Sequence, residues 1–204
     1  MRINKKKFIY LISPTKIKKD FYINLIAVLK LKKVSFFQLR LKNMSFKKKL
    51  IIGKKIKKIC KKHNTKFLIN DDVILSKKLN ADGCHLGQKD MEISKARKII
   101  KKKIIGITCH NSIKLAKLAI KKKADYIAFG AFNISKTKKT KFKADISLLK
   151  KIKKITKTPI VAIGGINSNN YKNLLLNKAN FLAISGYIWN NKKLKPIDAI
   201  KKLK

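Results

Sequence analysis

The chain has 204 residues, of which 45% are hydrophobic, so residues 1–204 are expected to form one domain that buries a core without disulfides. Its three cysteines are an odd number set far apart, which indicates reduced thiols and a cytoplasmic protein, and no apolar run reaches the roughly 18 residues of a membrane span. The formal net charge of +45 is of the kind seen in nucleic-acid-binding proteins, but the lysines are spread along the whole chain without a basic groove or interleaved aromatic residues, so no specific nucleic-acid partner is expected.

Eight short apolar runs alternate with stretches of helical periodicity along the chain. The runs are predicted to be strands at residues 8–12, 34–39, 67–69, 82–86, 104–107, 125–129, 159–163 and 181–185. Eight such units in about 200 residues are typical of an α/β protein, and they predict a compact (β/α)8 TIM barrel, with a doubly wound open sheet as the alternative. In a barrel, functional residues are expected at the C-terminal ends of the strands, with phosphate held near strands seven and eight.

The segments between the runs carry helix signals of different strength. Residues 112–123 place apolar side chains on one helical face, with Asn111 or Ser112 as the cap. Asn167, Ser168 or Asn169 is expected to cap the helix after the seventh run. The helix after residue 71 is expected to be short, and the Lys-rich connection 130–145 is expected to be a mobile loop.

The second run continues into alternating polar and apolar residues, in which Gln38, Arg40 and Lys42 share one parity with Phe36. In a barrel this polar face would point inward, whereas in an edge strand it would face solvent. Arg40 is one of only three arginines, and its planar fork suits bidentate phosphate binding.

Five of the nine acidic residues fall between residues 71 and 92, after the third and fourth runs. Asp71 and Asp90 are interpreted as two ligands of one Mg²⁺ ion, because this cation takes one or two carboxylates together with waters and phosphate oxygens. Asp72 and Glu92 are interpreted as helix caps.

Glycines and hydroxyl residues follow the later runs. Ser135, Thr137 and Lys138 follow the sixth run, and IGGI (163–166) and ISG (184–186) follow the seventh and eighth. Backbone amides at such glycines approach an anion closely, so a phosphate site is expected there.

Each of Cys84 and Cys109 stands directly before a histidine, which raises the question of a zinc site. Neighbouring residues on a strand point to opposite faces, so each pair offers one ligand to a common centre, and inert thiols are the preferred interpretation. His85 and His110 remain candidates for handling a proton in the pocket.

Five ordered motifs carry a resemblance to a known family: QLRLK (38–42), INDD (69–72), ADGCHLGQKD (81–90), SKTKK (135–139) and VAIGGI (161–166). Over about residues 10–188 the chain resembles the thiamine-phosphate synthase family, which includes the thiazole tautomerase branch. The resemblance implies an enzyme that joins 4-amino-2-methyl-5-(diphosphooxymethyl)pyrimidine to a carboxylated thiazole phosphate and releases pyrophosphate and CO₂.

The resemblance also implies roles for individual residues. The pyrimidine diphosphate would be bound by Gln38, Leu39, Arg40, Leu41, Lys42, Asn70, Thr108 and Lys138, and the thiazole phosphate by Ser135, Lys136, Thr137, Gly165, Ile184 and Ser185. Arg40, Lys42 and Lys138 would act on the leaving group, with Mg²⁺ on Asp71 and Asp90. Thr108 stands where the family usually has serine, and Ala131 and Ile134 stand where it commonly has prolines.

Three hypotheses follow from these residues. The first is the Mg²⁺-dependent synthase acting on small phosphorylated substrates. The second is a tautomerase that uses His85 or His110, and the third is a basic RNA-associated protein. The sequence leaves the oligomeric state open, a homo-oligomer included.

Overall fold

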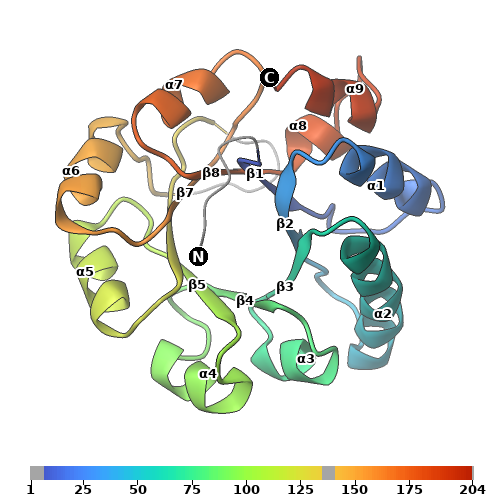
Figure 1. The fold of residues 1–204 in the computed structure, drawn as a ribbon, viewed down its shortest axis with the longest axis horizontal. Coiled ribbons are helices and arrows are strands. Elements are labelled where there is room, and N and C mark those ends of the chain that lie inside the picture. The colour runs from blue at the N-terminus through green and yellow to red at the C-terminus, as the bar shows by residue number, and fades with distance from the viewer. Residues whose placement is uncertain (1–6, 135–140, 204) are drawn as a thin grey trace.

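Eight parallel strands close into a barrel surrounded by helices in a computed structural model, which describes residues 7–134 and 141–203 (Figure 1). The strands are β1 (Ile9–Ile12), β2 (Val34–Leu39), β3 (Lys66–Asn70), β4 (Gly83–Leu86), β5 (Ile104–Thr108), β6 (Tyr126–Phe129), β7 (Ile160–Ile163) and β8 (Phe181–Ile184). The helices are α1 (Phe21–Lys30), α2 (Phe46–Lys62), α3 (Val73–Lys78), α4 (Ile93–Ile100), α5 (Ile113–Lys121), α6 (Ser147–Ile155), α7 (Tyr171–Leu176), α8 (Gly186–Trp189) and α9 (Pro196–Lys201).

The strands pair in chain order from β1 to β8, and β8 pairs with β1, so the barrel is closed. This topology confirms the predicted (β/α)8 fold and excludes the open sheet. Every predicted strand end lies within one residue of the observed one. A closed barrel has no edge, so β2 is not an edge strand and its polar face lies inside the barrel.

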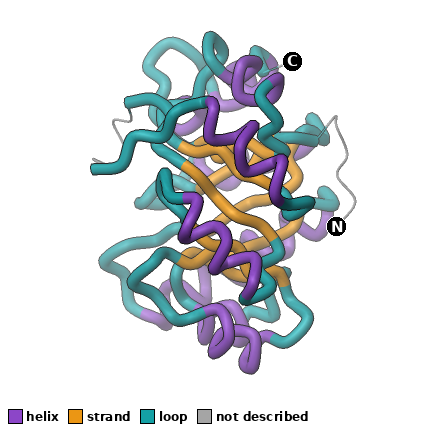
Figure 2. The backbone as a smooth tube through the Cα atoms, turned by 90° about the vertical axis from the view of Figure 1, so that its left-hand side faces the viewer, coloured by secondary structure: helices purple, strands orange, loops and turns teal. Residues whose placement is uncertain are grey.

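Two apolar clusters hold this architecture together. The outer cluster fills the space between the strands and the helices, which enclose the strands in the side view of Figure 2. The inner cluster fills the barrel and includes Tyr10, Phe36, Tyr126 and Phe181. Gly106 makes room for one of these side chains, because a Cβ atom at this position would lie 1.8 Å from the Tyr126 ring. Side chains therefore fill the barrel interior, and a ligand site is expected at the C-terminal ends of the strands.

Two of the predicted helix caps are confirmed. Ser112 Oγ accepts a hydrogen bond of 3.2 Å from the backbone N–H of Leu115 at the start of α5. Asp72 Oδ1 accepts one of 2.8 Å from the N–H of Leu75 at the start of the short α3.

Glu92 also stands at the N-cap of α4, but its side chain makes no capping hydrogen bond and pairs instead with Lys122.

The predicted caps of the helix after β7 were wrong, because α7 begins after Asn170. The reason lies in a turn that precedes the helix. The Asn170 side chain accepts a hydrogen bond of 2.9 Å from the N–H of Asn167, whose own side chain accepts one of 2.8 Å from Asn169. These amides close the turn and displace the helix start.

The predicted mobile loop at 130–145 falls partly outside the described residues, at 135–140. Its two described ends are joined, since Ala131 donates a hydrogen bond of 3.0 Å to the carbonyl of Phe142 and accepts one of 2.9 Å from Ala144. Within residues 7–134 and 141–203, no helix has the length and hydropathy that a membrane crossing requires.

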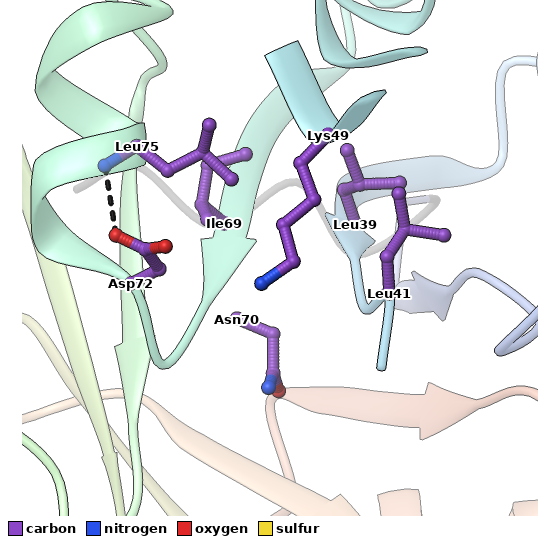
Figure 3. Close-up of a pocket in the computed structure, with 7 residues that line it drawn as sticks. All are labelled: Leu39, Leu41, Lys49, Ile69, Asn70, Asp72 and Leu75. Atoms are coloured by element: carbon purple, nitrogen blue, oxygen red, sulfur yellow. Dashed lines mark hydrogen bonds between the residues drawn. The ribbon is translucent and has the colours of Figure 1, made fainter. Parts of the chain in front are cut away.

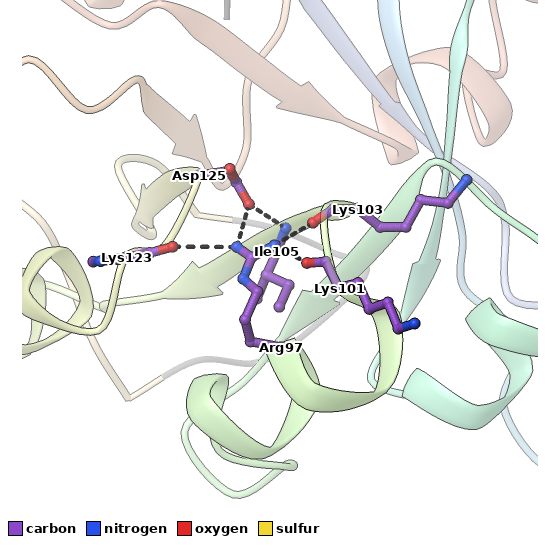
Figure 4. Close-up of polar contacts among 6 residues, drawn as sticks. All are labelled: Arg97, Lys101, Lys103, Ile105, Lys123 and Asp125. Atoms are coloured by element: carbon purple, nitrogen blue, oxygen red, sulfur yellow. Dashed lines mark hydrogen bonds and ion pairs between the residues drawn. The ribbon is translucent and has the colours of Figure 1, made fainter.

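Arg97 ties together the N-terminal ends of β5 and β6 (Figure 4). Its guanidinium donates to the carbonyls of Lys101 and Lys103 at 2.7 and 2.6 Å, and to the Asp125 carboxylate at 2.7 Å. The same carboxylate accepts a hydrogen bond of 2.8 Å from the N–H of Ile105, so one fork joins a helix end to two strands.

Replacing Arg97 by alanine is expected to lower the free energy of unfolding by about 2 kcal/mol, because several charge-assisted hydrogen bonds are lost and the Asp125 carboxylate loses its partner. Urea denaturation measures this change. Arg97→Lys keeps the charge without the planar fork, so an intermediate loss is expected. Unchanged denaturation midpoints in both variants would contradict the stabilising role.

Candidate active site

A pocket of about 1180 Å³ opens at the C-terminal ends of the strands. Its wall includes residues at or just beyond the ends of β2, β3, β4, β5, β7 and β8, among them Arg40, Asp71, Asp90, Thr108 and Ser185. The position is the one expected for a functional site in this fold.

The end of β2 separates polar and apolar side chains as its alternation predicted. Gln38, Arg40 and Lys42 line the pocket. Leu39 and Leu41 lie on the opposite face, where they border a small cavity beside Lys49 of α2 (Figure 3). The structure therefore brings the amide and the two cations into the pocket and leaves the two leucine side chains outside it.

Ser13, directly after β1, fixes the backbone that carries Arg40. It is 1% exposed, and its Oγ accepts a hydrogen bond of 2.9 Å from the N–H of Arg40. Its own N–H donates a hydrogen bond of 2.9 Å to the carbonyl of Gln38. A buried hydroxyl thus holds the backbone of Arg40, and Arg40 lines the pocket.

Asp71 and Asp90 come together in the pocket wall. Loss of solvation and the adjacent, hydrogen-bonded Asp90 carboxyl raise the pKa of Asp71 to about 6, whereas a hydrogen bond from Asn70 and the positive charge of Arg40 act in the opposite direction. Asp71 has a φ of 64°, a left-handed conformation that aspartate tolerates, and its N–H donates to the His85 carbonyl at 2.8 Å. Two carboxyl groups are therefore held side by side next to a cation.

The donor set at this point fits a magnesium ion. Both groups are carboxylates, which suit a hard cation, and a pair leaves the other coordination positions to water or to phosphate oxygens. Within the described part of the chain, no cluster of three or more histidine, cysteine, aspartate or glutamate side chains could hold a metal. A zinc centre built from three such side chains is therefore not found among those residues.

Asp90 is also bound by the loop that carries it. Its carboxylate accepts a hydrogen bond of 2.6 Å from the N–H of Gly87, and a Cβ at position 87 would lie 3.0 Å from the same oxygen. This loop therefore turns Asp90 back toward the end of β4 instead of letting it cap α4.

The ends of β7 and β8 form another part of the pocket. Gly165 has a φ of 56°, a conformation that favours glycine, and it lines the pocket. Ile184 packs into the outer cluster and borders the pocket at its strand end, next to Ser185. The other residues proposed for the thiazole phosphate, Ser135 to Thr137, and the cation Lys138 lie outside the described residues.

The cysteine and histidine pairs divide between two faces as expected. Cys84 and Cys109 are buried free thiols in the outer cluster, and burial raises their pKa values, so they are inert. His85 and His110 line the pocket. His110 stacks on Phe142 with the ring centroids 4.0 Å apart.

Sequence reasoning missed two tyrosines inside the barrel. Tyr10 and Tyr126 are fully buried, and their hydroxyls lie 2.7 Å apart although the residues are 116 positions apart in the chain. Tyr10 also donates to Gln38, and Tyr126 lies 2.8 Å from His85 Nδ1. The available signal was a tyrosine on the inward parity of an otherwise apolar strand.

Comparisons with known proteins show the family to which this chain is similar. The family model described as "Thiamine monophosphate synthase" matches residues 9–188. A thiamine-phosphate synthase of Pelagibacter ubique is 70% identical and is aligned over 100% of both chains. One of Erythrobacter litoralis is 37% identical over 89% of this chain and 88% of that protein.

Solved structures give the same result. A thiamine phosphate pyrophosphorylase from Pyrococcus furiosus superposes with a TM-score of 0.86 at 27% identity, covering 98% of this chain and 94% of the other. One from Bacteroides thetaiotaomicron, at 17% identity and a TM-score of 0.71, covers 96% and 95% and supports the fold alone. The length of the profile match and the full-length similarity leave one assignment: the chain belongs to the thiamine monophosphate synthase family.

Proposed function

We propose that this protein is a thiamine-phosphate synthase. It joins 4-amino-2-methyl-5-(diphosphooxymethyl)pyrimidine to a carboxylated thiazole phosphate and releases pyrophosphate, CO₂ and thiamine phosphate. The observation that carries the proposal is the meeting of Asp71 and Asp90 beside Arg40, in one pocket at the strand ends. The curated relatives that bear this name support it.

The bond that breaks joins the pyrimidine methylene to a diphosphate oxygen, which keeps the electron pair. The electron-rich aminopyrimidine delocalises the resulting positive charge, and the thiazole nitrogen forms the new bond to the methylene. The bond from the thiazolium ring to its carboxylate then breaks and CO₂ leaves, and the electron pair that stays on the ring carbon takes up a proton from solvent. The protein therefore needs to position two substrates and neutralise a departing anion, and no strong base is required in this step.

Arg40 and Lys42 are assigned to the departing diphosphate, because both border the pocket and Arg40 lies close enough to Asp71 to affect its pKa. Asp71 and Asp90 would hold Mg²⁺, which when bound supplies charge neutralisation for the diphosphate. Lys138, outside the described residues, is assigned to the same substrate by the family resemblance.

The remaining pocket residues are assigned to the organic parts of the substrates. Gln38, Asn70 and Thr108 border the region next to the acid pair and are proposed to contact the pyrimidine diphosphate. Gly165, Ile184 and Ser185 are proposed to hold the thiazole phosphate, together with residues 135–137. A cytoplasmic location remains a prediction from the sequence.

An assay with both phosphorylated precursors tests this function directly. Purified protein with Mg²⁺ is expected to form thiamine phosphate, detected by fluorescence after oxidation, and to release pyrophosphate in equal amount. Omitting either precursor is the control. Folded, metal-supplied protein that forms no product would refute the proposal.

The same preparation separates the tautomerase alternative, in which His85 or His110 would move a proton on the thiazole alone. Proton exchange into the thiazole phosphate in heavy water, without the pyrimidine substrate and without Mg²⁺, would favour that reaction. We expect no such exchange.

Magnesium is expected to stabilise the fold through Asp71. At a Mg²⁺ concentration of about 100 times Kd, the stabilisation is about 2.7 kcal/mol, which raises Tm by about 5–11 °C in a protein of this size. Differential scanning fluorimetry at pH 8 measures the shift. Asp71→Asn should abolish it, while Asp72→Asn, the neighbouring helix cap, should keep it.

The magnesium effect is expected to depend on pH with a defined sign. Because the pKa of Asp71 is raised to about 6, the folded state binds a proton more tightly than the unfolded chain. Proton binding to Asp71 therefore stabilises the folded, metal-free protein at low pH, and this stabilisation is lost as the pH rises through about 6. Protons compete with Mg²⁺ below that pH, so the Mg²⁺-induced rise in Tm should be smaller at pH 5.5 than at pH 8. An equal rise at both pH values would contradict the assignment.

A further inference from the structure

A row of hydrogen bonds crosses the barrel interior, largely along the pocket wall, and links residues of six strands. Its contacts are Thr108 Oγ1 with His85 Nε2 at 2.9 Å, His85 Nδ1 with Tyr126 Oη at 2.8 Å, Tyr126 Oη with Tyr10 Oη at 2.7 Å, Tyr10 Oη with Gln38 Oε1 at 2.6 Å, and Gln38 Nε2 with Asn70 Oδ1. We call this row the interior chain.

The two amides set the direction of the first bonds. Asn70 turns its carbonyl oxygen toward Gln38 and accepts a hydrogen bond from Gln38 Nε2. Gln38 then donates from Nε2 and keeps its own oxygen for the hydroxyl of Tyr10. Flipping Gln38 alone would place two acceptors against each other, and flipping Asn70 alone would place two donors against each other.

The same reasoning extends through the tyrosines to His85. The Tyr10 hydroxyl has one hydrogen, and Gln38 accepts it, so Tyr126 must donate its hydrogen to Tyr10. Tyr126 can then only accept from His85, which must carry its proton on Nδ1. In the neutral ring this leaves Nε2 as an acceptor, and the Thr108 hydroxyl donates to it.

We propose that the Asn70–Gln38 amide pair sets one direction for the whole interior chain, and that Tyr10 and Tyr126 are positioning residues that hold these two amides in fixed orientation in the pocket wall. Both tyrosines are at most 1% exposed, so a donor left without an acceptor there is costly. The catalytic part of this inference rests on the proposed function, whereas the bond direction does not.

The protonated nitrogen of His85 tests the direction. The chain has three histidines, so ¹⁵N spectra of histidine-labelled protein at pH 8 are simple, and signals are assigned by their loss in His63→Asn and His110→Asn. Wild-type His85 is expected to be the neutral tautomer with its proton on Nδ1. A proton on Nε2, or a doubly protonated ring, would overturn the proposal.

Removing one buried hydroxyl should reverse part of the interior chain. In Tyr10→Phe the hydrogen of Tyr126 loses its acceptor and is expected to turn to His85 Nδ1. His85 then carries its proton on Nε2 and donates to Thr108. This tautomer switch lies two hydrogen bonds away from the substitution, and a purely structural role for Tyr10 would not produce it.

Kinetics test the positioning role with a matched pair of variants. Tyr10→Phe removes the hydrogen bond to Gln38 and is expected to lower kcat/KM for the pyrimidine diphosphate about tenfold. Tyr126→Phe leaves the bond from Tyr10 to Gln38 intact and should lower it less than about threefold. Tyr171→Phe makes the same chemical change at a buried site outside the barrel, against Phe8, and is the control with unchanged kcat/KM.

The His85 tautomer and kcat/KM test different parts of the proposal. A His85 tautomer that stays the same in Tyr10→Phe overturns the directional chain, whether or not the protein is active. Equal kinetic losses in the three tyrosine variants overturn the positioning role. Absence of thiamine phosphate from the wild-type reaction would refute the proposed function alone and would leave the tautomer result to decide the direction.

Discussion

Replacing Asp71 by asparagine is expected to lower kcat/KM for the pyrimidine diphosphate by about a thousandfold, equivalent to about 4 kcal/mol of transition-state stabilisation. The substitution keeps the size of the side chain and removes the charge that faces Asp90 and Arg40. It also removes the proposed metal ligand. The left-handed backbone at this position is kept, because asparagine tolerates the same φ. The loss should therefore appear in catalysis and not in folding.

The neighbouring carboxylate provides the control for this variant. Asp72 caps α3 through Leu75 and borders the small cavity of Figure 3, away from the large pocket. Asn is as good a cap as Asp, so Asp72→Asn should retain both stability and turnover. Steady-state kinetics over a range of Mg²⁺ concentrations measure both variants. Wild-type turnover in Asp71→Asn would remove the metal site and the mechanism built on it.

The barrel could be predicted because a local sequence pattern marks each strand. Short apolar runs, bounded by caps such as Ser112 and Asp72, specify where strands end and helices begin. The alternation at Gln38 and Arg40 was enough to assign the inward face of β2, since the side-chain period of a strand is two. Both signals depend only on residues close together in sequence.

The convergence of Asp71 and Asp90 could be expected only once the barrel was assumed. Parallel strand ends meet at one face of the barrel, so acids after β3 and β4 become neighbours. Asp72 and Glu92 follow the same two strands but stand at helix N-termini, as the sequence indicated. The difference arises from the left-handed turn at residue 71 and the hydrogen bond that holds Asp90 to Gly87.

The interior chain and the Arg97 fork could not be predicted from local patterns. Tyr10 and Tyr126 contact each other across the barrel, and Arg97 reaches the start of β6 from the end of α4. Such contacts depend on the barrel's closure, which places distant segments at fixed separations. Local periodicity describes which face a residue is on, but not which partner it meets there.

The distribution of arginine connects these observations to one further prediction. The chain uses lysine almost everywhere, yet arginine stands at position 97, where a planar fork joins three backbone segments, and at position 40, beside the acid pair. Arg97 needs the geometry of its donors as well as its charge. The same argument applies to Arg40 if it binds a diphosphate through two parallel hydrogen bonds.

Replacing Arg40 by lysine is therefore expected to lower kcat about a hundredfold, even though the charge is preserved, because a point charge cannot reproduce two aligned donors on the departing diphosphate. Ser13 still holds the backbone, so the substituted side chain starts from the same place. Lys42→Arg is the converse control, since it supplies a fork further out on the exposed end of the strand. Single-turnover measurements of pyrophosphate formation, made after acid quenching, separate bond cleavage from product release. A wild-type kcat in Arg40→Lys would show that positive charge alone is sufficient at this position. The aligned hydrogen bonds to the diphosphate would then have to come from other residues of the pocket.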